Sequence, residues 1–128
     1  MSDLQKIDFE TLYNKLLDKF PNLKTNPVWQ NWDWSNESCE QSVVISEVAI
    51  ELIQWGEKND WGNVKDLLIE IEAAFVHGTD SVIAYLGTDF TVTVMECKNS
   101  VLRAHIKQLM GEKTFEAYQI NLRGYREG

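Results

Sequence analysis

The chain has 128 residues, 44% of them hydrophobic and 25% charged, with 12 Lys and Arg against 20 Asp and Glu, a formal net charge of −8. This length predicts a single domain over residues 1–128, and the apolar fraction excludes an intrinsically disordered chain. The acidic balance makes nucleic acid and anionic membrane surfaces poor partners, because affinity for phosphate groups comes from clustered Lys and Arg.

The N-terminal periodic segment, roughly residues 3–20, predicts an amphipathic helix. Its apolar side chains recur at the i, i+3, i+4, i+7 spacing that places them on one face of a helix. These side chains are Phe9, Leu12, Tyr13, Leu16, Leu17 and Phe20. Pro21 follows directly and ends the helix, because proline lacks the N–H that would continue the hydrogen-bond ladder.

Targeting signals are not visible in the sequence. The N-terminus lacks a basic stretch followed by an apolar one, and no run approaches the roughly 20 apolar residues that a membrane helix needs. We therefore expect a cytoplasmic protein. In that reducing compartment Cys39 and Cys97 are expected to be free thiols rather than a disulfide.

Residues 21–37 interrupt the helical pattern with two prolines, four asparagines and three tryptophans. No hydrophobic period holds there, so the sequence predicts an ordered, acidic, Trp-rich loop. A second helix is expected to begin near Ser35 or Ser38, since either serine can cap free N–H groups, and to end near Gly56. The third helix, roughly residues 61–77, has the clearest apolar stripe of all.

The fourth segment, from residue 81 to about Cys97, predicts a helix with Asp80 as its N-cap. A strand is the alternative, because the run Thr91–Val94 is β-branched throughout. We favour the helix, since every neighbouring segment is helical and a lone strand would have no partner.

A fifth helix is expected after a cap at Asn99 or Ser100, and a sixth from about Glu112, with Gly111 separating the two. The sequence thus predicts an all-α fold of about six helices. Short connections favour antiparallel neighbours, so the helices are expected to pair as hairpins. A compact bundle and a short HEAT-like solenoid both remain open.

Motifs for catalysis and for metal or cofactor binding are absent from the sequence. It contains no phosphate-binding glycine loop, no nucleophile elbow and no His-Glu-x-x-His. It also lacks the Glu-x-x-His motif of di-metal helical bundles, so Glu47 and Glu51 are assigned to a solvated helix face. His77 is expected at a helix C-terminus and His105 on an apolar stripe. We predict that the protein is not an enzyme. The alternative is an enzyme whose site is assembled from Cys97, His105 and a carboxylate.

The acidic charge is concentrated in the N-terminal half. Residues 1–64 hold 5 Lys and Arg against 11 Asp and Glu, whereas residues 65–128 hold 7 against 9. Between Lys24 and Lys58 there is no Lys or Arg at all, and this stretch contains four of the five tryptophans. An acidic stretch of this kind attracts a basic partner.

The Trp-rich loop and the residues that follow it are the candidate partner-binding site. Two interpretations stand side by side: the tryptophans either plug the edge of the core or form the binding surface, because large aromatic residues dominate both. For the binding surface we predict contributions from Trp29, Trp32, Asp33, Trp34, Glu37 and Glu40. Trp32 and Trp34 would be its anchors, and the carboxylates would steer a basic partner towards it.

The span from Trp61 to Tyr118 resembles a group of small helical bacterial proteins. The segments that carry the resemblance are WGNVKDLLIEIE from Trp61, GTDSV from Gly78, Tyr85-Leu86-Gly87, and LMGEKT from Leu109. In that group a Gly-x-Asp/Glu turn and a Met/Leu-Gly-Pro-x-Thr junction separate the helices. This chain departs from the pattern at Gly87, where the group has an acidic residue, and at Glu112, where it has proline.

The resemblance implies an all-helical, solenoid-like domain. Proteins similar to this group often act as immunity proteins that neutralise secreted bacterial toxins, including those of contact-dependent growth inhibition. It implies no catalytic residue, metal ligand or cofactor. The function expected from it is the binding of a basic toxin domain, and the alternative is a small helical adaptor that docks a protein partner of its own cell.

Overall fold

The computed structural model describes residues 6–25 and 41–127 and is helical in nearly all of that range. Its elements are α1 (Phe9–Lys19), the 3₁₀ helix η1 (Pro21–Thr25), α3 (Gln41–Glu57), α4 (Trp61–His77), α5 (Asp80–Tyr85), the π-helical turn η2 (Leu86–Phe90), α6 (Thr91–Met95), α7 (Ser100–Leu109) and α8 (Glu112–Glu127). The predicted all-α fold is confirmed.

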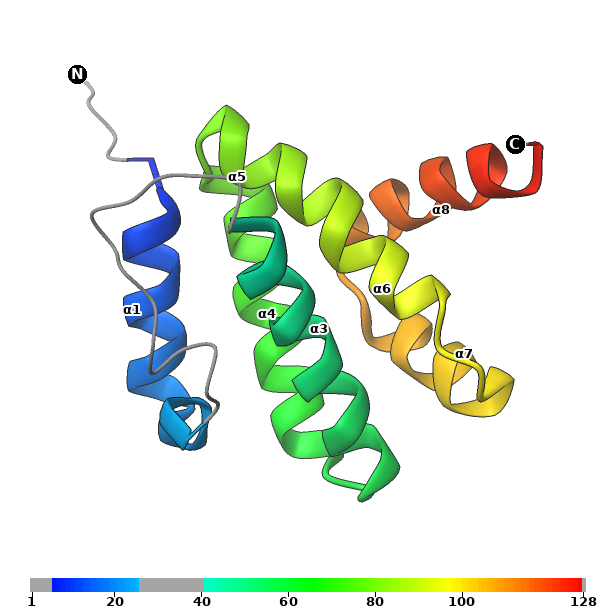
Figure 1. Cartoon of the computed structure of the whole chain (residues 1–128), viewed down its shortest axis with the longest axis horizontal. Helices are drawn as coiled ribbons and strands as arrows, with labels where there is room; N and C mark the ends of the chain where they lie inside the picture. The colour runs from blue at the N-terminus through cyan, green and yellow to red at the C-terminus, as the bar shows by residue number, and fades with distance from the viewer. Residues whose placement is uncertain (1–5, 26–40, 128) are drawn as a thin grey trace.

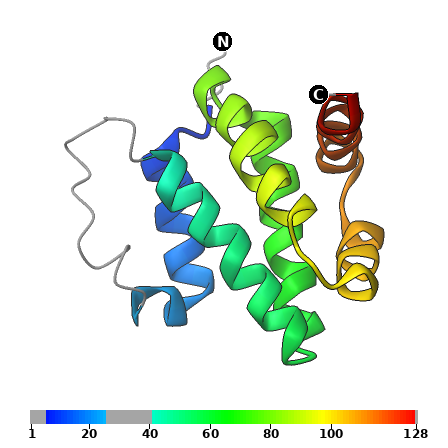
Figure 2. The ribbon, with the colours of Figure 1, turned by 45° about the vertical axis from the view of Figure 1, so that its right-hand side comes forward.

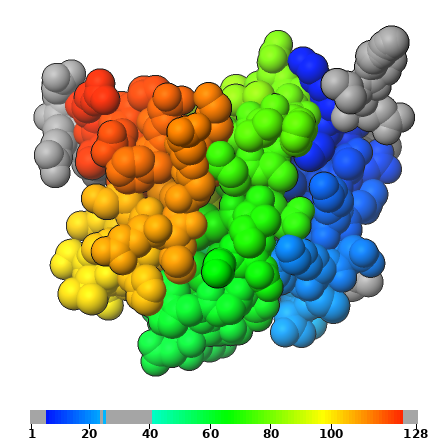
Figure 3. All heavy atoms as spheres, turned by 180° about the vertical axis from the view of Figure 1, so that it is seen from behind, coloured from blue at the N-terminus to red at the C-terminus, as the bar shows by residue number. Residues whose placement is uncertain are grey.

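The helices are arranged in two layers (Figures 1 and 2). α5, η2 and α6 follow one another without a break, and we call them the 80–95 helix; it lies beside α3 in one layer. α4 and α8 form the other layer, and α8 packs against both α4 and the 80–95 helix. Seen from behind, α4 lies between α1 on one side and α7 and α8 on the other (Figure 3).

A single apolar core lies between the layers and draws on nearly every helix. Its fully buried side chains include Leu16 of α1, Val48 of α3, Ile71 of α4, Phe90 of η2 and Ile106 of α7. Burial of this apolar surface is the main force that holds short helices together, because such helices are marginal in isolation.

α1 begins later than the sequence pattern predicts. The start near residue 3 is wrong in the described part, because residues 6–8 are extended and the helix starts at Phe9. The Asp8 carboxylate caps it by accepting the N–H of Thr11 at 2.8 Å. Ile7 instead pairs with the turn after α4, donating to the His77 carbonyl at 2.9 Å and accepting from Thr79 N at 3.0 Å. These bonds fix α1 beside α4.

The first part of the predicted loop is also more regular than expected. Residues 21–25 form the 3₁₀ helix η1, and Leu23 within it is fully buried. The predicted start of the second helix, near Ser35 or Ser38, lies outside the described residues. Within them α3 runs to Glu57, one residue past the predicted end.

The connections around α4 are tight turns. Asn59, between α3 and α4, is the one described residue other than glycine with a positive φ, at 62°. At the far end Gly78 closes α4 with an extended backbone, at a φ of −75°. The predicted cap Asp80 is wrong, since the Thr79 hydroxyl accepts the N–H of Val82 at 3.2 Å. Thr79 precedes the first helical residue, which is the position where a hydroxyl can reach free N–H groups.

The segment from residue 81 to about Cys97, for which the sequence allowed a helix or a strand, is helical from Asp80 to Met95. Its regular pattern is interrupted only by η2, where Thr91 N donates to the Leu86 carbonyl, five residues back. A π turn of this kind frees a carbonyl from the ladder. The Gly87 carbonyl accepts from the Thr91 hydroxyl at 2.7 Å and from the Asn121 side-chain amide. Asn121 also donates to Thr91 Oγ1 at 2.9 Å, which ties α8 to the 80–95 helix.

α7 has the predicted cap, but one side chain, His105, does not lie where the sequence pattern predicts. Asn99 Oδ1 accepts the N–H of Leu102 at 3.0 Å, as expected. His105 is exposed and stacks on Trp61 with ring centroids 3.7 Å apart, so its predicted place on the apolar stripe is wrong. Leu102 and Ile106 fill the core positions of this helix.

The N-terminus of α8 is capped from another helix. The Glu72 carboxylate of α4 accepts the backbone N–H groups of Lys113 and Thr114, both at 2.9 Å, and the Thr114 hydroxyl at 2.8 Å. A carboxylate is favoured here because it satisfies free N–H groups and meets the positive end of the helix dipole. Gly111 makes room for it, since a Cβ there would lie 2.5 Å from the Glu72 carboxylate.

We expect Glu72→Gln to lower the free energy of unfolding by about 1–2 kcal/mol, the usual cost of losing a charged cap. Gly111→Ala should cost about as much, because the new methyl group displaces the carboxylate. Since both changes remove the same cap, the double variant should cost much less than their sum. Urea unfolding checks this, with the exposed Asp66→Asn of α4 as the control. Additive costs would contradict the shared cap.

The same cap gives a pH dependence. Burial raises the pKa of Glu72, but the hydrogen bonds from Lys113 and Thr114 and the charge of Lys113 outweigh it, so the pKa is lowered overall. A lowered folded-state pKa contributes stability above the unfolded value of about 4.3, and this is lost as pH falls through the folded pKa. We therefore expect the stability difference between wild type and Glu72→Gln to shrink below about pH 4.

Candidate protein-binding face

The six side chains predicted to bind a partner all lie outside the described residues. Trp29, Trp32, Asp33, Trp34, Glu37 and Glu40 fall in the range 26–40. Their contribution therefore stays a prediction. The described chain resumes at Gln41, so α3 is the element that directly follows them.

The solvent side of α3 carries a regular stripe of side chains, which we call the α3 outer face. It consists of Val43, Glu47, Ile50, Gln54 and Glu57. Their alternating spacing of four and three residues places them along one side of the helix. Val43 is 51% exposed and Ile50 is 37% exposed. Figure 1 shows α3 at the front of the molecule, with α4 behind it.

The charge on this face has a single sign. α3 contains Glu47, Glu51 and Glu57 and no basic residue. Lys15 and Lys19 of α1 form ion pairs with Glu70 of α4, at 3.9 and 2.9 Å. The α3 outer face thus combines exposed apolar side chains with carboxylates, the combination that suits a basic protein surface.

Other exposed apolar side chains have a different setting. Ile69 and Val76 of α4 are 53% and 52% exposed, but their helix carries the exposed residues Lys65 and Asp66, of opposite charge. Val101 on α7 and Ile120 on α8 stand on separate helices. Figure 3 shows these three helices together on the face opposite to α3. This face lacks the uniform acidic charge of α3.

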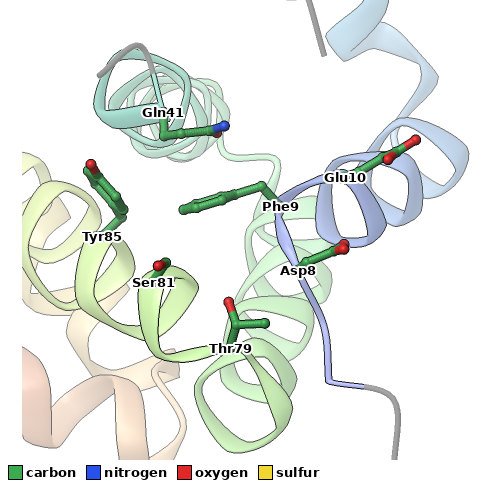
Figure 4. A pocket seen from close by; sticks show the side chains of 7 residues that line it. All are labelled: Asp8, Phe9, Glu10, Gln41, Thr79, Ser81 and Tyr85. Atoms are coloured by element: carbon green, nitrogen blue, oxygen red, sulfur yellow. The ribbon is translucent and has the colours of Figure 1, made fainter. Parts of the chain in front are cut away.

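A pocket of about 520 Å³ opens near the N-termini of α1, α3 and α5 (Figure 4). It is lined by Asp8, Phe9, Glu10, Gln41, Thr79, Ser81 and Tyr85. Figure 4 shows the Phe9 ring reaching between Gln41 and Ser81, and the Asp8 and Glu10 carboxylates turned towards the α1 side. A hydrogen bond to the backbone of Thr11 lowers the pKa of Asp8, which acts as the α1 cap.

The buried polar groups behind this pocket are structural. The Tyr13 hydroxyl donates to Gln41 Oε1 at 3.1 Å and so joins α1 to the start of α3. Burial raises the pKa of Tyr13 well above its usual range, and the charge of Asp89 adds to the effect. Asp89 itself accepts the Ser42 hydroxyl at 2.8 Å, which joins α3 to η2. These bonds hold α3 in place with its outer face towards solvent.

The residues of the enzymatic alternative have structural neighbours. Cys97 is a free thiol that lies 3.8 Å from the Asn99 carbonyl, and His105 stacks on Trp61. Over residues 6–25 and 41–127, no three His, Cys, Asp or Glu side chains gather as metal ligands would. Over the same residues, no helix has the length and apolar character needed to cross a membrane.

Sequence reasoning missed Val43 and Ile50. The inward stripe of α3 contains Ile45, Val48, Ala49 and Leu52, which are buried, and Ile53, which is half-buried. Val43 and Ile50 lie off that stripe, seven residues apart, and that spacing is the signal that would have identified them.

Comparison with known proteins gave no match to any family model, curated protein or solved structure.

Proposed function

We propose that the protein is a cytosolic immunity protein that binds a basic bacterial toxin domain and neutralises it by covering a surface that the toxin needs. The observation that carries this proposal is the α3 outer face, where exposed Val43 and Ile50 lie among carboxylates of one sign. No chemical step is required of the protein.

In the proposed complex, charge and apolar contact have different roles. Carboxylates on one face raise the rate of encounter with a basic partner, and apolar side chains among them hold the complex once water is excluded. Toxin domains that act on nucleic acid are basic, because affinity for phosphate groups comes from Lys and Arg. An acidic face that docks on such a domain blocks the access of its substrate.

The test is co-expression with the product of the adjacent upstream reading frame, which on this proposal is a large secreted protein with a variable C-terminal domain. We expect the chain to co-purify with the C-terminal domain of that protein and to restore the growth of cells that express the domain. No complex together with no protection would refute the proposal. Association should also slow as salt rises, because exposed charges are screened; a rate independent of salt would point to an adaptor that docks by apolar contact alone.

A further inference from the structure

We propose that the pocket between the N-terminal ends of α1, α3 and α5 binds an uncharged monosaccharide. We call it the interhelix pocket, and it is lined by the seven residues labelled in Figure 4. Its volume of about 520 Å³ lies in the range of small-molecule sites. None of the lining residues belongs to the α3 outer face, so this site is independent of the proposed function.

Gln41 supplies the observation that points to a ligand. Its side chain lines the pocket and is only 7% exposed, and its Oε1 accepts the structural hydrogen bond from the Tyr13 hydroxyl. Within residues 6–25 and 41–127, the side-chain nitrogen of Gln41 has no hydrogen-bond acceptor. Figure 4 shows this nitrogen at the tip of the side chain, turned towards α1. A buried amide N–H without an acceptor costs free energy, so the pocket favours a molecule that brings an oxygen to this point.

The walls of the pocket combine aromatic rings with hydroxyl groups. Phe9 and Tyr85 are half-buried and meet edge to face, with ring centroids 5.5 Å apart. Thr79 and Ser81 carry hydroxyl groups on the opposite side of the Phe9 ring from Gln41 (Figure 4). A sugar ring has the matching chemistry, because its C–H bonds pack on aromatic rings while its hydroxyl groups both donate and accept hydrogen bonds.

Charge disfavours an ionic ligand of either sign. The N-termini of helices attract anions, but two of those that meet here carry carboxylates of their own. Asp8 caps α1 and Glu10 lies in its first turn, while Asp80 lies in the first turn of α5. The described residues that line the pocket include no Lys, Arg or His to hold an anion. The carboxylates of Asp8 and Glu10 turn towards the α1 side, so no anionic group points inward to hold a cation (Figure 4).

The experiment is an NMR titration of the intact chain with the methyl glycosides of glucose, galactose and mannose. Each has a matched probe in which a carboxylate replaces the C6 hydroxymethyl group. We expect at least one neutral glycoside to shift the amide signals of residues 8–10, 41 and 79–85 at millimolar concentration, and its acidic counterpart to bind at least tenfold more weakly. Equal binding of the two forms, shifts confined to other residues, or no binding of any neutral glycoside would overturn the inference.

Gln41→Glu tests the donor and keeps the contact that the fold uses. The new carboxylate still accepts the Tyr13 hydroxyl, and it stands at the first residue of α3, where negative charge is favoured. It has no N–H to donate, so the affinity for the neutral glycoside should fall at least tenfold. Gln119→Glu, exposed on α8, makes the same chemical change elsewhere and should leave the affinity unchanged.

Tyr85→Leu tests the aromatic wall, because leucine stays apolar but has no ring on which a sugar can pack. The affinity for the glycoside should fall at least threefold, whereas Phe115→Leu, at a half-buried aromatic residue of α8, should leave it unchanged. The amide spectrum of each variant without sugar shows whether the fold is retained. If folded Gln41→Glu and Tyr85→Leu bind the glycoside as tightly as the wild type, the inference fails.

Discussion

Phe90→Ala is expected to lower the free energy of unfolding by about 3–5 kcal/mol, the largest effect that a single substitution should have in this chain. Phe90 is fully buried, and it belongs to η2, the turn that packs against both α3 and α8. Removing its ring leaves a cavity between the two layers, and the surrounding helices are held by other contacts that prevent full collapse.

Urea or thermal unfolding followed by circular dichroism measures this effect. Ile120→Ala on α8, where the side chain is 60% exposed, is the matched control and should change stability by less than about 0.5 kcal/mol. A cost below about 1 kcal/mol for Phe90→Ala would mean that η2 is not part of the common core.

Asn121→Ala is expected to cost about 2–3 kcal/mol through polar groups rather than packing. Its side-chain amide donates to the Gly87 carbonyl, to Thr91 Oγ1 at 2.9 Å and to the Ala117 carbonyl at 3.0 Å. Thr91 is fully buried, so it cannot turn to water for a replacement partner. The carbonyl that the π turn releases would likewise lose its external donor.

The control for this substitution is Gln119→Ala, which is exposed on the same helix. Hydrogen exchange should report the site of the damage, with faster exchange of the amides of residues 86–91 in Asn121→Ala. Equal stability of the two variants would show that η2 does not depend on α8.

The sequence predicted the helices wherever the apolar period and the local caps agreed. The third helix, α4, has the predicted bounds, because a long apolar stripe is flanked by the Asn59–Asp60 turn and by Gly78. Asn99 was identified as a cap because the N-cap interaction is local. The prediction of a helix for the segment that forms the 80–95 helix was also correct, because its buried face follows a helical period. Its β-branched residues had made a strand the alternative.

The errors arose where distant contacts decide the local structure. α1 starts at Phe9 because Ile7 pairs with the turn after α4, seventy residues away in sequence. The cap of α8 comes from Glu72 of α4, and the carbonyl of Gly87 finds its donor in Asn121. No window of local sequence contains either pair.

The candidate site divides in the same way. The concentration of acidic residues between Lys24 and Lys58 is visible in the sequence and pointed to this part of the chain. The exposure of Val43 and Ile50 was not predicted, because an apolar residue in a helix is expected in the core. Only their position to one side of the buried stripe of α3 distinguishes them from core residues. The tertiary structure adds that the two side chains and the carboxylates share one face.

The α3 outer face is tested most directly by amide hydrogen exchange on the chain, free and in complex with the toxin domain that the proposed function expects the adjacent upstream reading frame to encode. If the α3 outer face is the binding surface, side chains of the toxin domain cover it in the complex. We expect added protection within residues 43–57 and none on α7 and α8. Protection confined to α4, α7 and α8, with α3 unchanged, would contradict the assignment of α3 as the partner-binding face.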